Sequence, residues 1–486
     1  MKLNTLCAAA GIAPAGTDAN VTGFAIDHRK IAPGTVFGAF RGARFNGEDF
    51  IDAAIKAGAV AIVAHPDAKV EGAAHFADAE PRRLFAALAA PFFAPPPETL
   101  VAVTGTNGKT STVELVRQIW RMAGQRAASI GTLGVTTSDE TVSTGLTTPD
   151  IVTFLANLSG LAREGVTHVA YEASSHGLSQ FRSEGPRVVA GAFTNLSRDH
   201  LDYHATMDEY FTAKMRLFDE VVTPGGMAVV WADDAWSDKA IDHAKARGLK
   251  LFTVGMKGAD IRLVSRTPTA LGQKLEIEYL GKVRLIDLPL IGAYQAANAL
   301  VAAGLVLACG GDEHLTFDAM KRLVTVRGRI ERAAITPSGA PVYVDYAHTP
   351  DALEAAIAAL RPHVTGKLIT VFGAGGDRDQ GKRPEMGRVA GEGADLAIVT
   401  DDNPRGEDPA AIRAMVLAGM AAGAREVGDR REAIGLAVAE AGAGDVVLIA
   451  GKGHEQGQII GSGDNVRVLP FDDVTVAREM AGSLGR

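Results

Sequence analysis

Short apolar runs alternate with longer amphipathic segments along most of the chain. Runs with the length of buried strands occur at 101–104, 128–131, 168–172 and 188–193, and again at 342–344, 368–372, 396–400 and 446–449. The segments between them repeat apolar residues at the spacing of one helix face, as in 351–360. Strands that alternate with helices in this way predict parallel sheets with helices on both faces, so the expected fold class is α/β.

The first predicted domain covers residues 1–97 and is a small α/β unit. Its short strands are expected at 24–27, 36–40 and 60–64, and its helix is expected at 49–57. The segment Pro95-Pro96-Pro97 then forms a stiff polyproline linker. This linker is predicted to separate the first domain from the rest of the chain.

Two larger domains are predicted beyond the linker. The central one, residues 98–331, has a P-loop-type, mostly parallel sheet with helices on both faces and a late antiparallel hairpin at 274–286. The third, residues 332–486, begins near the turn at 337–339 and is Rossmann-like. A length of 486 residues is too great for one hydrophobic core and agrees with about three domains.

Composition narrows the class of protein. Hydrophobic residues make up 47% and charged residues 22% of the chain, which is a globular balance. The net charge of −8 argues against non-specific nucleic-acid binding. Cys7 and Cys309 cannot form a disulfide framework, so we expect a cytoplasmic protein. No signal peptide is visible, and Gly292, Gln295, Asn298 and Gly304 interrupt the uncharged stretch 288–311, so no membrane insertion is expected.

The most specific motif is the segment Thr104–Ser111, which lies between a buried strand and an amphipathic helix. A glycine-rich turn that leads into a helix points backbone N–H groups at a phosphate chain. Lys109 adds a positive charge, and the Thr110 hydroxyl can complete a Mg²⁺ shell. Val103 stands where the full pattern has its first glycine, so this is a shortened variant. A plain glycine turn with a solvated lysine is the alternative, but strand, lysine and helix in register favour phosphate binding.

Two further polar clusters follow strands of the central domain. In Glu172–Gly177 the carboxylate can hold a metal, although a serine-capped turn fits equally well. In Thr194–His204, histidines and aspartates can supply a metal ligand, and an N-capped loop with solvated charges is the alternative. Lys214 lies on the apolar face of a predicted helix at 207–218. Most such lysines only reach past that face to water, but a partly buried one with a lowered pKa is open to modification.

The predicted third domain carries three clusters at strand ends, namely Phe372–Asp379, Asp402–Arg405 and Gly451–Glu455. Arg378 and Arg405 can each bind a carboxylate through two parallel N–H groups. Asp402 and Glu455 can accept hydrogen bonds from an ammonium group. Together these groups predict a receptor for a zwitterion. The alternative is that Arg405 and the nearby Glu407 form an exposed ion pair that contributes little.

These motifs, together with Asp345–Asp351, resemble those of the Mur ligases, and most closely the members that add meso-diaminopimelate. The resemblance covers all three domains in order. It implies that the first binds the UDP end of a UDP-N-acetylmuramoyl-L-alanyl-D-glutamate substrate, the second binds ATP and the third binds the incoming amino acid. The positions that match the UDP-muramoyl-dipeptide contacts are Ile26, His28, Ala43, Arg44, Phe45, Thr147, Thr148, Ser174, Gln180 and Arg182.

The same resemblance assigns the nucleotide, the metal and the catalytic lysines. The ATP positions are Gly105, Thr106, Asn107, Gly108, Lys109, Thr110, Ser111, Asn298, Arg329, Asp345 and His348. The positions of the Mg²⁺ shell are Thr110, Glu172 and His200. The resemblance implies that the catalytic residues are Lys109, Lys214, Glu172 and His200. Lys214 matches the lysine that these ligases carry as a CO₂-derived carbamate, which turns a cation into an anion near the metal.

The matching amino-acid pocket consists of Arg378, Asp402, Asn403, Pro404, Arg405, Gly451 and Glu455. Arg405 suits a second carboxylate, which diaminopimelate has and lysine lacks. The expected enzyme is therefore a monomeric ATP-dependent ligase of peptidoglycan precursor synthesis that acts through an acyl phosphate on small-molecule substrates. Lysine addition, folylpolyglutamate synthesis and a regulatory P-loop ATPase remain open as alternatives, although the chain has no Asn-Lys-x-Asp guanine motif.

Overall fold

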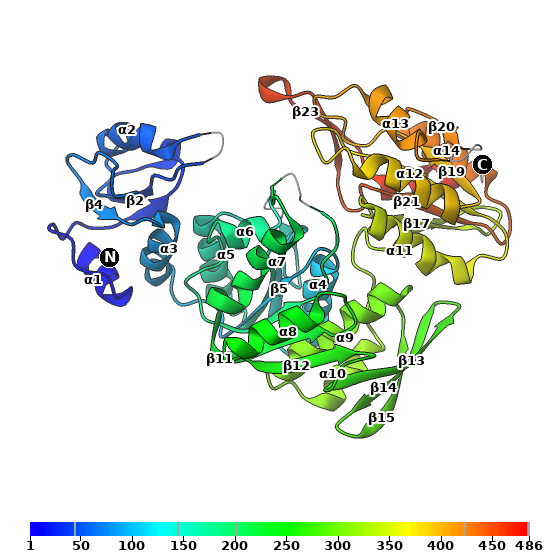
Figure 1. The fold of residues 1–486 in the computed structure, drawn as a ribbon, viewed down its shortest axis with the longest axis horizontal. Helices are drawn as coiled ribbons and strands as arrows, with labels where there is room; N and C mark the ends of the chain where they lie inside the picture. The colour runs from blue at the N-terminus through cyan, green and yellow to red at the C-terminus, as the bar shows by residue number, and fades with distance from the viewer. Residues whose placement is uncertain (43–44, 143–144, 200–202, 421–423, 484–486) are drawn as a thin grey trace.

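The computed structural model describes residues 1–42, 45–142, 145–199, 203–420 and 424–483. They fold into three α/β units, each with its own main sheet, and the first and third units lie on either side of the second (Figure 1). The predicted fold class is confirmed. The domain boundaries near residues 97 and 331 stay predictions.

The first unit has a parallel sheet in the order β1-β2-β3-β4. Its elements are α1 (Leu3–Ala9), β1 (Gly23–Ala25), β2 (Thr35–Gly38), α2 (Ile51–Lys56), β3 (Ala61–Ala64), β4 (Ala74–Ala77) and α3 (Pro81–Phe92). The sequence did not predict β4, because its residues are only partly buried and form a weak apolar run. The helix predicted at 49–57 starts instead as a 3₁₀ turn, Gly47–Phe50, which the Asn46 side chain caps.

The second unit contains an eleven-stranded sheet in the order β15-β14-β13-β12-β11-β10-β5-β9-β6-β7-β8. Its strands are β5 (Thr99–Thr104), β6 (Ala127–Gly131), β7 (Gly134–Thr136), β8 (Thr141–Val142), β9 (His168–Glu172), β10 (Val188–Phe193), β11 (Val222–Trp231), β12 (Lys250–Gly255), β13 (Ile261–Thr269), β14 (Gly272–Tyr279) and β15 (Lys282–Leu288). The middle of the sheet is parallel, and β13, β14 and β15 form an antiparallel arm. Strand β5 lies between β9 and β10, so the loops that follow these three strands meet at one edge.

Helices cover both faces of this sheet. They are α4 (Lys109–Met122), α5 (Ile151–Arg163), α6 (Ser175–Ser179), α7 (Met207–Arg216), α8 (Ser237–Ala246), α9 (Ala293–Ala308) and α10 (Glu313–Met320). The helix predicted at 207–218 changes to a π-helical turn at Leu217–Val221. The uncharged stretch 288–311 forms mainly α9, which is buried against α4, β11 and β12. Among the described residues, no helix is both long and apolar enough to cross a membrane.

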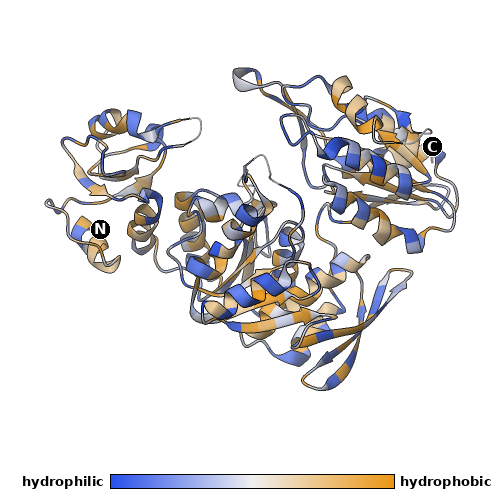
Figure 2. Ribbon diagram, in the orientation of Figure 1, coloured by the Kyte–Doolittle hydropathy of each residue, from blue (hydrophilic) through white to orange (hydrophobic). Residues whose placement is uncertain are grey.

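The third unit has a six-stranded sheet in the order β16-β17-β21-β18-β19-β20 and a separate hairpin, β22-β23. Its strands are β16 (Glu331–Ile335), β17 (Pro341–Asp345), β18 (Leu368–Phe372), β19 (Leu396–Val399), β20 (Arg425–Glu426), β21 (Val446–Ala450), β22 (Gly457–Ile460) and β23 (Arg467–Pro470). Its helices are α11 (Pro350–Leu360), α12 (Lys382–Gly393), α13 (Pro409–Leu417), α14 (Arg430–Glu440) and α15 (Asp473–Ser483). Hydrophobic residues concentrate on the sheet strands, whereas the covering helices carry hydrophilic stretches (Figure 2).

Candidate active site

The loop between β5 and α4 closes around two glycines that no other residue can replace without a clash. Gly108 has a φ of +87°, and a Cβ there would lie 2.3 Å from Asn298 Oδ1. A Cβ at Gly105 would lie 1.9 Å from Thr194 Oγ1. The missing Cβ atoms let the Asn298 and Thr194 side chains pack directly against this turn, which leads into the N-terminus of α4.

The loop after β10 holds this turn in place. Thr194 Oγ1 donates to the Asn107 carbonyl oxygen at 2.7 Å, and Asn195 Oδ1 accepts from the Asn107 N–H at 2.9 Å. The Thr106 N–H donates to the Asn195 carbonyl oxygen at 2.9 Å. The first two residues of the Thr194–His204 cluster thus shape residues 105–108, which we call the phosphate turn after their predicted role. His200, predicted as a metal ligand, lies outside the described residues.

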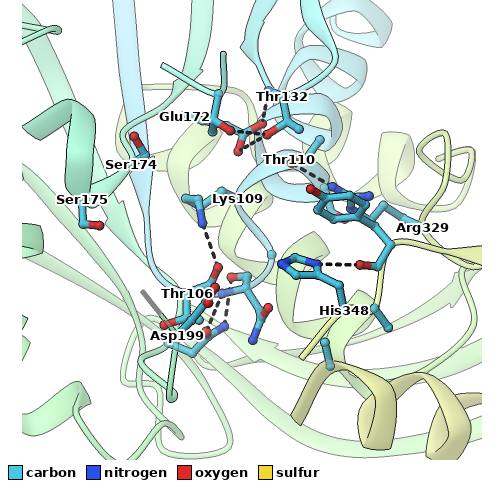
Figure 3. Close-up of a pocket in the computed structure, with 18 of the residues that line it drawn as sticks. Thr106, Lys109, Thr110, Thr132, Glu172, Ser174, Ser175, Asp199, Arg329 and His348 are labelled. Atoms are coloured by element: carbon cyan, nitrogen blue, oxygen red, sulfur yellow. Dashed lines mark hydrogen bonds between the residues drawn. The ribbon is translucent and has the colours of Figure 1, made fainter. Parts of the chain in front are cut away.

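Lys109 folds back over the same turn. Its ammonium group donates to the carbonyl oxygen of Gly105 at 2.9 Å. It also donates to the carbonyl oxygen of Thr106 at 2.8 Å (Figure 3). Burial lowers the pKa of Lys109, and the nearby Arg329 lowers it further, while the charges of Glu172 and Asp199 oppose the shift. An anionic ligand would oppose this shift, because its negative charge favours the charged form of Lys109.

Glu172 ends β9 with its side chain almost fully buried, at 1% residue exposure. Its Oε1 accepts from the Thr132 N–H at 2.7 Å, and its Oε2 accepts from Thr132 Oγ1 at 3.2 Å (Figure 3). Thr110 Oγ1 accepts from Arg329 Nη2 at 3.2 Å. Within the part of the chain that the structure describes, no three histidine, cysteine or acidic side chains cluster as a metal site. A hydroxyl and one carboxylate nevertheless fit Mg²⁺, which usually takes one or two protein ligands beside phosphates and waters.

Lys214 of α7 is buried, with 1% exposure, beside the phosphate turn. Its Nζ donates to the Gly105 carbonyl oxygen at 2.7 Å and lies 4.2 Å from the centre of the Tyr210 ring. Burial and the positive charge of Lys109 lower the pKa of Lys214 well below its usual value. The residue is therefore a buried amine of reduced basicity rather than a lysine that reaches water.

Residues between the second and third units close the other side of the turn. Arg329 lies over the Tyr346 ring at 4.6 Å, and His348 Nδ1 is 2.9 Å from the Tyr346 carbonyl oxygen (Figure 3). The Asp345 carboxylate accepts from the N–H groups of Ile330 and Ala347, each at 2.8 Å. Burial raises the pKa of Asp345 and lowers that of His348, so the imidazole is neutral near pH 7. Asn298 Nδ2 is buried, and among described residues it has no hydrogen-bond acceptor.

These groups line one cavity of about 580 Å³. It collects every predicted ATP position except Gly105, together with Glu172, Lys214 and four predicted dipeptide contacts, Thr147, Thr148, Ser174 and Arg182. Gln180 is not in the lining, but its Oε1 accepts from Arg182 Nη2 at 2.7 Å. The seam between two units therefore contains a phosphate turn, buried lysines and acidic groups in one space.

Among the predicted contacts of the first unit, Ile26, His28 and Phe45 lie outside this cavity. His28 stacks on Phe50 with ring centroids 4.0 Å apart, Ile26 is partly buried, and Phe45 is 77% exposed. Ala43 and Arg44 lie outside the described residues. The structure thus keeps Ile26, His28 and Phe45 in the first unit, apart from the phosphate turn.

The predicted zwitterion receptor forms a second cluster, at the ends of β19 and β21 of the third unit. Asn403 Nδ2 donates to Glu455 Oε2 at 2.8 Å, and Arg405 Nη1 donates to the Gly376 carbonyl oxygen at 2.9 Å. Arg378 lines the large cavity, whereas Asp402, Asn403, Pro404, Arg405, Gly451 and Glu455 do not. The alternative Arg405–Glu407 surface pair is wrong, because Glu407 accepts two hydrogen bonds of 2.8 Å from the buried Arg383.

The sequence reasoning missed several residues that shape these sites. Thr132 positions Glu172, Tyr346 packs under Arg329, and Lys452 lies fully buried among the residues of the second cluster. Lys452 was visible inside the Gly451–Glu455 motif, but nothing in that motif showed that its ammonium group is buried. Tyr346 was also visible, inside the Asp345–Asp351 motif, but nothing there showed that its ring packs under Arg329. Thr132 gave no signal of its own, because it acts on a residue that is distant in sequence.

Three family models match the chain in succession. They are described as the Mur ligase family catalytic domain over residues 20–91, the Mur ligase middle domain over 103–306 and the Mur ligase glutamate ligase domain over 328–453. The chain belongs to the Mur ligase family.

Individual Mur ligases agree with this assignment. The UDP-N-acetylmuramoyl-L-alanyl-D-glutamate–2,6-diaminopimelate ligase of Zymomonas mobilis is 60% identical over 478 residues, which is 98% of each chain. A solved structure of a ligase with that same name is 32% identical, with a TM-score of 0.72 over 100% of this chain and 99% of the other. The MurF ligase of Thermotoga maritima in complex with ADP has a TM-score of 0.62 at 19% identity, covering 95% of this chain and 97% of its own, which shows the shared fold.

Proposed function

We propose that this Mur ligase joins meso-2,6-diaminopimelate to the D-glutamate of UDP-N-acetylmuramoyl-L-alanyl-D-glutamate, with ATP converted to ADP and phosphate. The observation that carries the proposal is the 60% identity, over 98% of both chains, to a relative named for that reaction. The two sites support the proposal. The cavity at the seam suits a triphosphate beside a carboxylate substrate, and the second cluster suits a zwitterion. We further propose that the protein is a monomer in the cytoplasm; the two free cysteines support that compartment.

The cavity at the seam is the proposed site of phosphoryl transfer. Gly105 to Ser111 would hold the phosphates of ATP through backbone N–H groups and Lys109, with Asn298, Arg329, Asp345 and His348 around the nucleotide. The buried Asn298 amide, which finds no acceptor among the residues that the structure describes, supports this role because an unsatisfied donor in such a place is suited to a ligand. Thr110, Glu172 and His200 would hold Mg²⁺, which supplies charge neutralisation between the triphosphate and the acceptor carboxylate when bound.

The proposed reaction has two steps. An oxygen of the D-glutamyl side-chain carboxylate attacks the γ-phosphorus of ATP, the bond to the bridging oxygen breaks, and ADP leaves. The resulting acyl phosphate is attacked by an amine of diaminopimelate, the C–O bond to phosphate breaks, and the amine loses one proton. Lys109 and the turn would offset the repulsion between the two anions, and Thr147, Thr148, Ser174, Gln180 and Arg182 would hold the dipeptide near them.

Lys214 is the proposed site of a carbamate. A neutral amine attacks CO₂, and burial together with the charge of Lys109 favours the neutral amine of Lys214. The carbamate would place an anion next to the turn that holds the phosphates, where it can help to position a metal ion.

The first unit would bind the UDP end of the nucleotide-sugar substrate, and the third unit would bind the incoming amino acid. Ile26, His28, Ala43, Arg44 and Phe45 are proposed to contact the UDP end. Arg378, Asn403, Pro404, Arg405, Gly451 and Glu455, with Asp402 behind them, are proposed to bind diaminopimelate. Because six of these seven residues lie outside the large cavity, we propose that the third unit moves toward the central unit during the reaction.

An amino-acid panel tests the proposal. Purified enzyme, ATP, Mg²⁺ and the UDP-muramoyl dipeptide are mixed with diaminopimelate, lysine, ornithine or glutamate, and products are identified by mass. A folate with glutamate forms a separate arm for the folylpolyglutamate alternative. We expect a tripeptide product with diaminopimelate and little with lysine, while efficient lysine or folate extension would contradict the proposed substrate.

A further inference from the structure

The second cluster contains two fully buried cations that the proposed reaction does not use. Lys452 and Arg430 have side-chain exposures of 0%, and so does Asp473. Buried charges are costly unless each is paired and hydrogen-bonded. The partners of these two cations therefore show which acidic groups of the cluster remain for a ligand.

Arg430 is satisfied inside the protein. Its Nε and Nη2 donate to the two oxygens of Asp473 at 2.8 and 2.7 Å, which is a bidentate pair between α14 and α15. Its Nη2 also donates to the Ala450 carbonyl oxygen at 2.9 Å, at the end of β21. Arg430 thus holds the end of β21 in place, and its pair with Asp473 adds no net charge.

Lys452 bonds to the residues that would contact the ligand. Its Nζ donates to Asn403 Oδ1 at 2.7 Å and to the Gly457 carbonyl oxygen at 2.8 Å, and it lies 3.4 Å from Asp402 Oδ1 and 3.7 Å from Glu455 Oε2. The Ile459 N–H also donates to Asn403 Oδ1, at 2.9 Å. Because Asn403 Oδ1 is thus occupied twice, the amide Nδ2 must face Glu455, where it donates at 2.8 Å.

The two carboxylates of the cluster differ in environment. Asp402 is 7% exposed, its Oδ1 accepts from the Asn403 N–H at 2.7 Å, and its nearest cation is Lys452. Burial alone would raise the pKa of Asp402, but Lys452 and Arg430 hold it below its usual value. The Glu455 side chain is 30% exposed, and burial and the charge of Asp402 raise its pKa. Asp402 is a compensated internal charge, and Glu455 is the exposed one.

We propose that Lys452 is a positioning residue for the amino-acid pocket: it is the internal counter-ion of Asp402 and fixes the orientation of the Asn403 amide. Lys452 lies closer to Asp402 than to Glu455, and Arg430 is paired with Asp473. At these strand ends Glu455 and the partly buried Arg405 are therefore left to face a ligand, beside Arg378, which lines the large cavity. Glu455 and Arg405 form one anion and one cation, which match the ammonium and carboxylate of one amino-acid centre. Asp402 then acts through Lys452 rather than on the ligand, which revises the expectation that both acids receive an ammonium group.

This inference rests on the proposed function, and a mutant cycle tests it. Lys452→Met removes the cation, Asp402→Asn removes the anion, and the double variant removes both. Lys367→Met, an exposed lysine of the same unit, is the matched control. The readouts are KM for diaminopimelate, KM for ATP, kcat and Tm, all measured on the full chain.

We expect Lys452→Met to raise the diaminopimelate KM at least about tenfold while the ATP KM changes less than about twofold, because a buried acid loses its partner. The double variant should bind diaminopimelate better than Lys452→Met alone, since replacing both charges restores the balance. Lys367→Met should match the wild type. An unchanged diaminopimelate KM in Lys452→Met, or a double variant as impaired as the product of the single effects, would overturn the proposal.

The remaining outcomes are also decisive. If Lys452→Met does not fold, the double variant replaces it: a folded double variant with near wild-type ATP KM supports the pair, and an unfolded one contradicts it. Failure of the wild type to use diaminopimelate is a failure of the proposed function instead. The cycle is then repeated with the amino acid that the panel selects, and the same comparison of double and single variants decides the role of Lys452.

Discussion

Lys214 donates a 2.7 Å hydrogen bond to the carbonyl oxygen of Gly105, a residue 109 positions earlier in the chain. This contact joins helix α7 to the turn between β5 and α4. It places a buried amine beside the backbone that the proposed mechanism uses for phosphate binding. The contact means that a change at Lys214 is transmitted directly to a turn that is far away in sequence.

Lys214→Ala should lose most ligase activity, because a carbamate there would supply a negative charge that alanine lacks. Added formate or acetate should restore part of the activity, and removal of CO₂ should slow the wild type reversibly. The exposed Lys239 of α8 provides the control variant Lys239→Ala, which should respond to neither treatment. Full activity of Lys214→Ala would exclude the lysine from the mechanism.

A pair of glycines tests the phosphate turn. Gly108 and Gly124 have φ values of +87° and +86°, but a Cβ meets Asn298 only at Gly108, whereas nothing lies within 4 Å at Gly124. Both Gly→Ala variants should lose about 1 kcal/mol or more of stability, because alanine is strained at positive φ. Only Gly108→Ala should also raise the ATP KM sharply. Equal ATP KM values for the two variants would contradict the role of the turn.

Arg405 is expected to select the amino acid. Arg405→Ala should raise the diaminopimelate KM about 10- to 100-fold, since a hydrogen bond to a charged group contributes about 1.5–3 kcal/mol. The ATP KM should stay nearly constant, and any slow turnover with lysine should be indifferent to the change. Arg388→Ala, on the surface of α12, is the matched control. Equal losses with diaminopimelate and lysine would count against the assignment of the second carboxylate.

Stability should depend on pH through Glu184, which lies where the first and second units meet. Its side chain is near Glu220, Arg216 and Arg83, and burial together with Glu220 raises its pKa to about 7 from 4.5. The folded state then binds a proton that the unfolded state has released, so the stabilisation is present below about pH 4.5 and is lost as pH rises through about 7. Tm measured from pH 5 to 8 should fall as Glu184 loses its proton, and Glu184→Gln should flatten this dependence of Tm on pH. A Glu184→Gln profile that keeps the wild-type slope would refute the shift.

Much of the fold could be predicted because its signals are local. Strands β9, β10 and β18 match their predicted ranges, since each has a mostly buried and largely apolar stretch of residues. The Thr104–Ser111 motif also lies within a few consecutive residues. Strands β11, β12 and β13 were not predicted separately, and β11 and β13 carry exposed stretches that break the apolar pattern.

The site was less predictable, because its contacts join distant parts of the chain. Arg329 reaches Thr110 across 219 residues, and Lys452 reaches Asn403 across 49. Spacing along the sequence showed that Asp402 and Glu455 are acidic groups at strand ends. Only the packing shows that one of them is matched by a buried lysine, which changes its expected role from ligand contact to support.

The central claim is that phosphoryl transfer from ATP to the D-glutamyl carboxylate precedes attack by the amine of diaminopimelate. The most direct measurement labels that carboxylate with oxygen-18 and follows the label with wild-type enzyme, ATP, Mg²⁺ and diaminopimelate. The account predicts one labelled oxygen in the released phosphate for each tripeptide formed, and little phosphate when the amino acid is omitted. Unlabelled phosphate released at the full rate without diaminopimelate would contradict it.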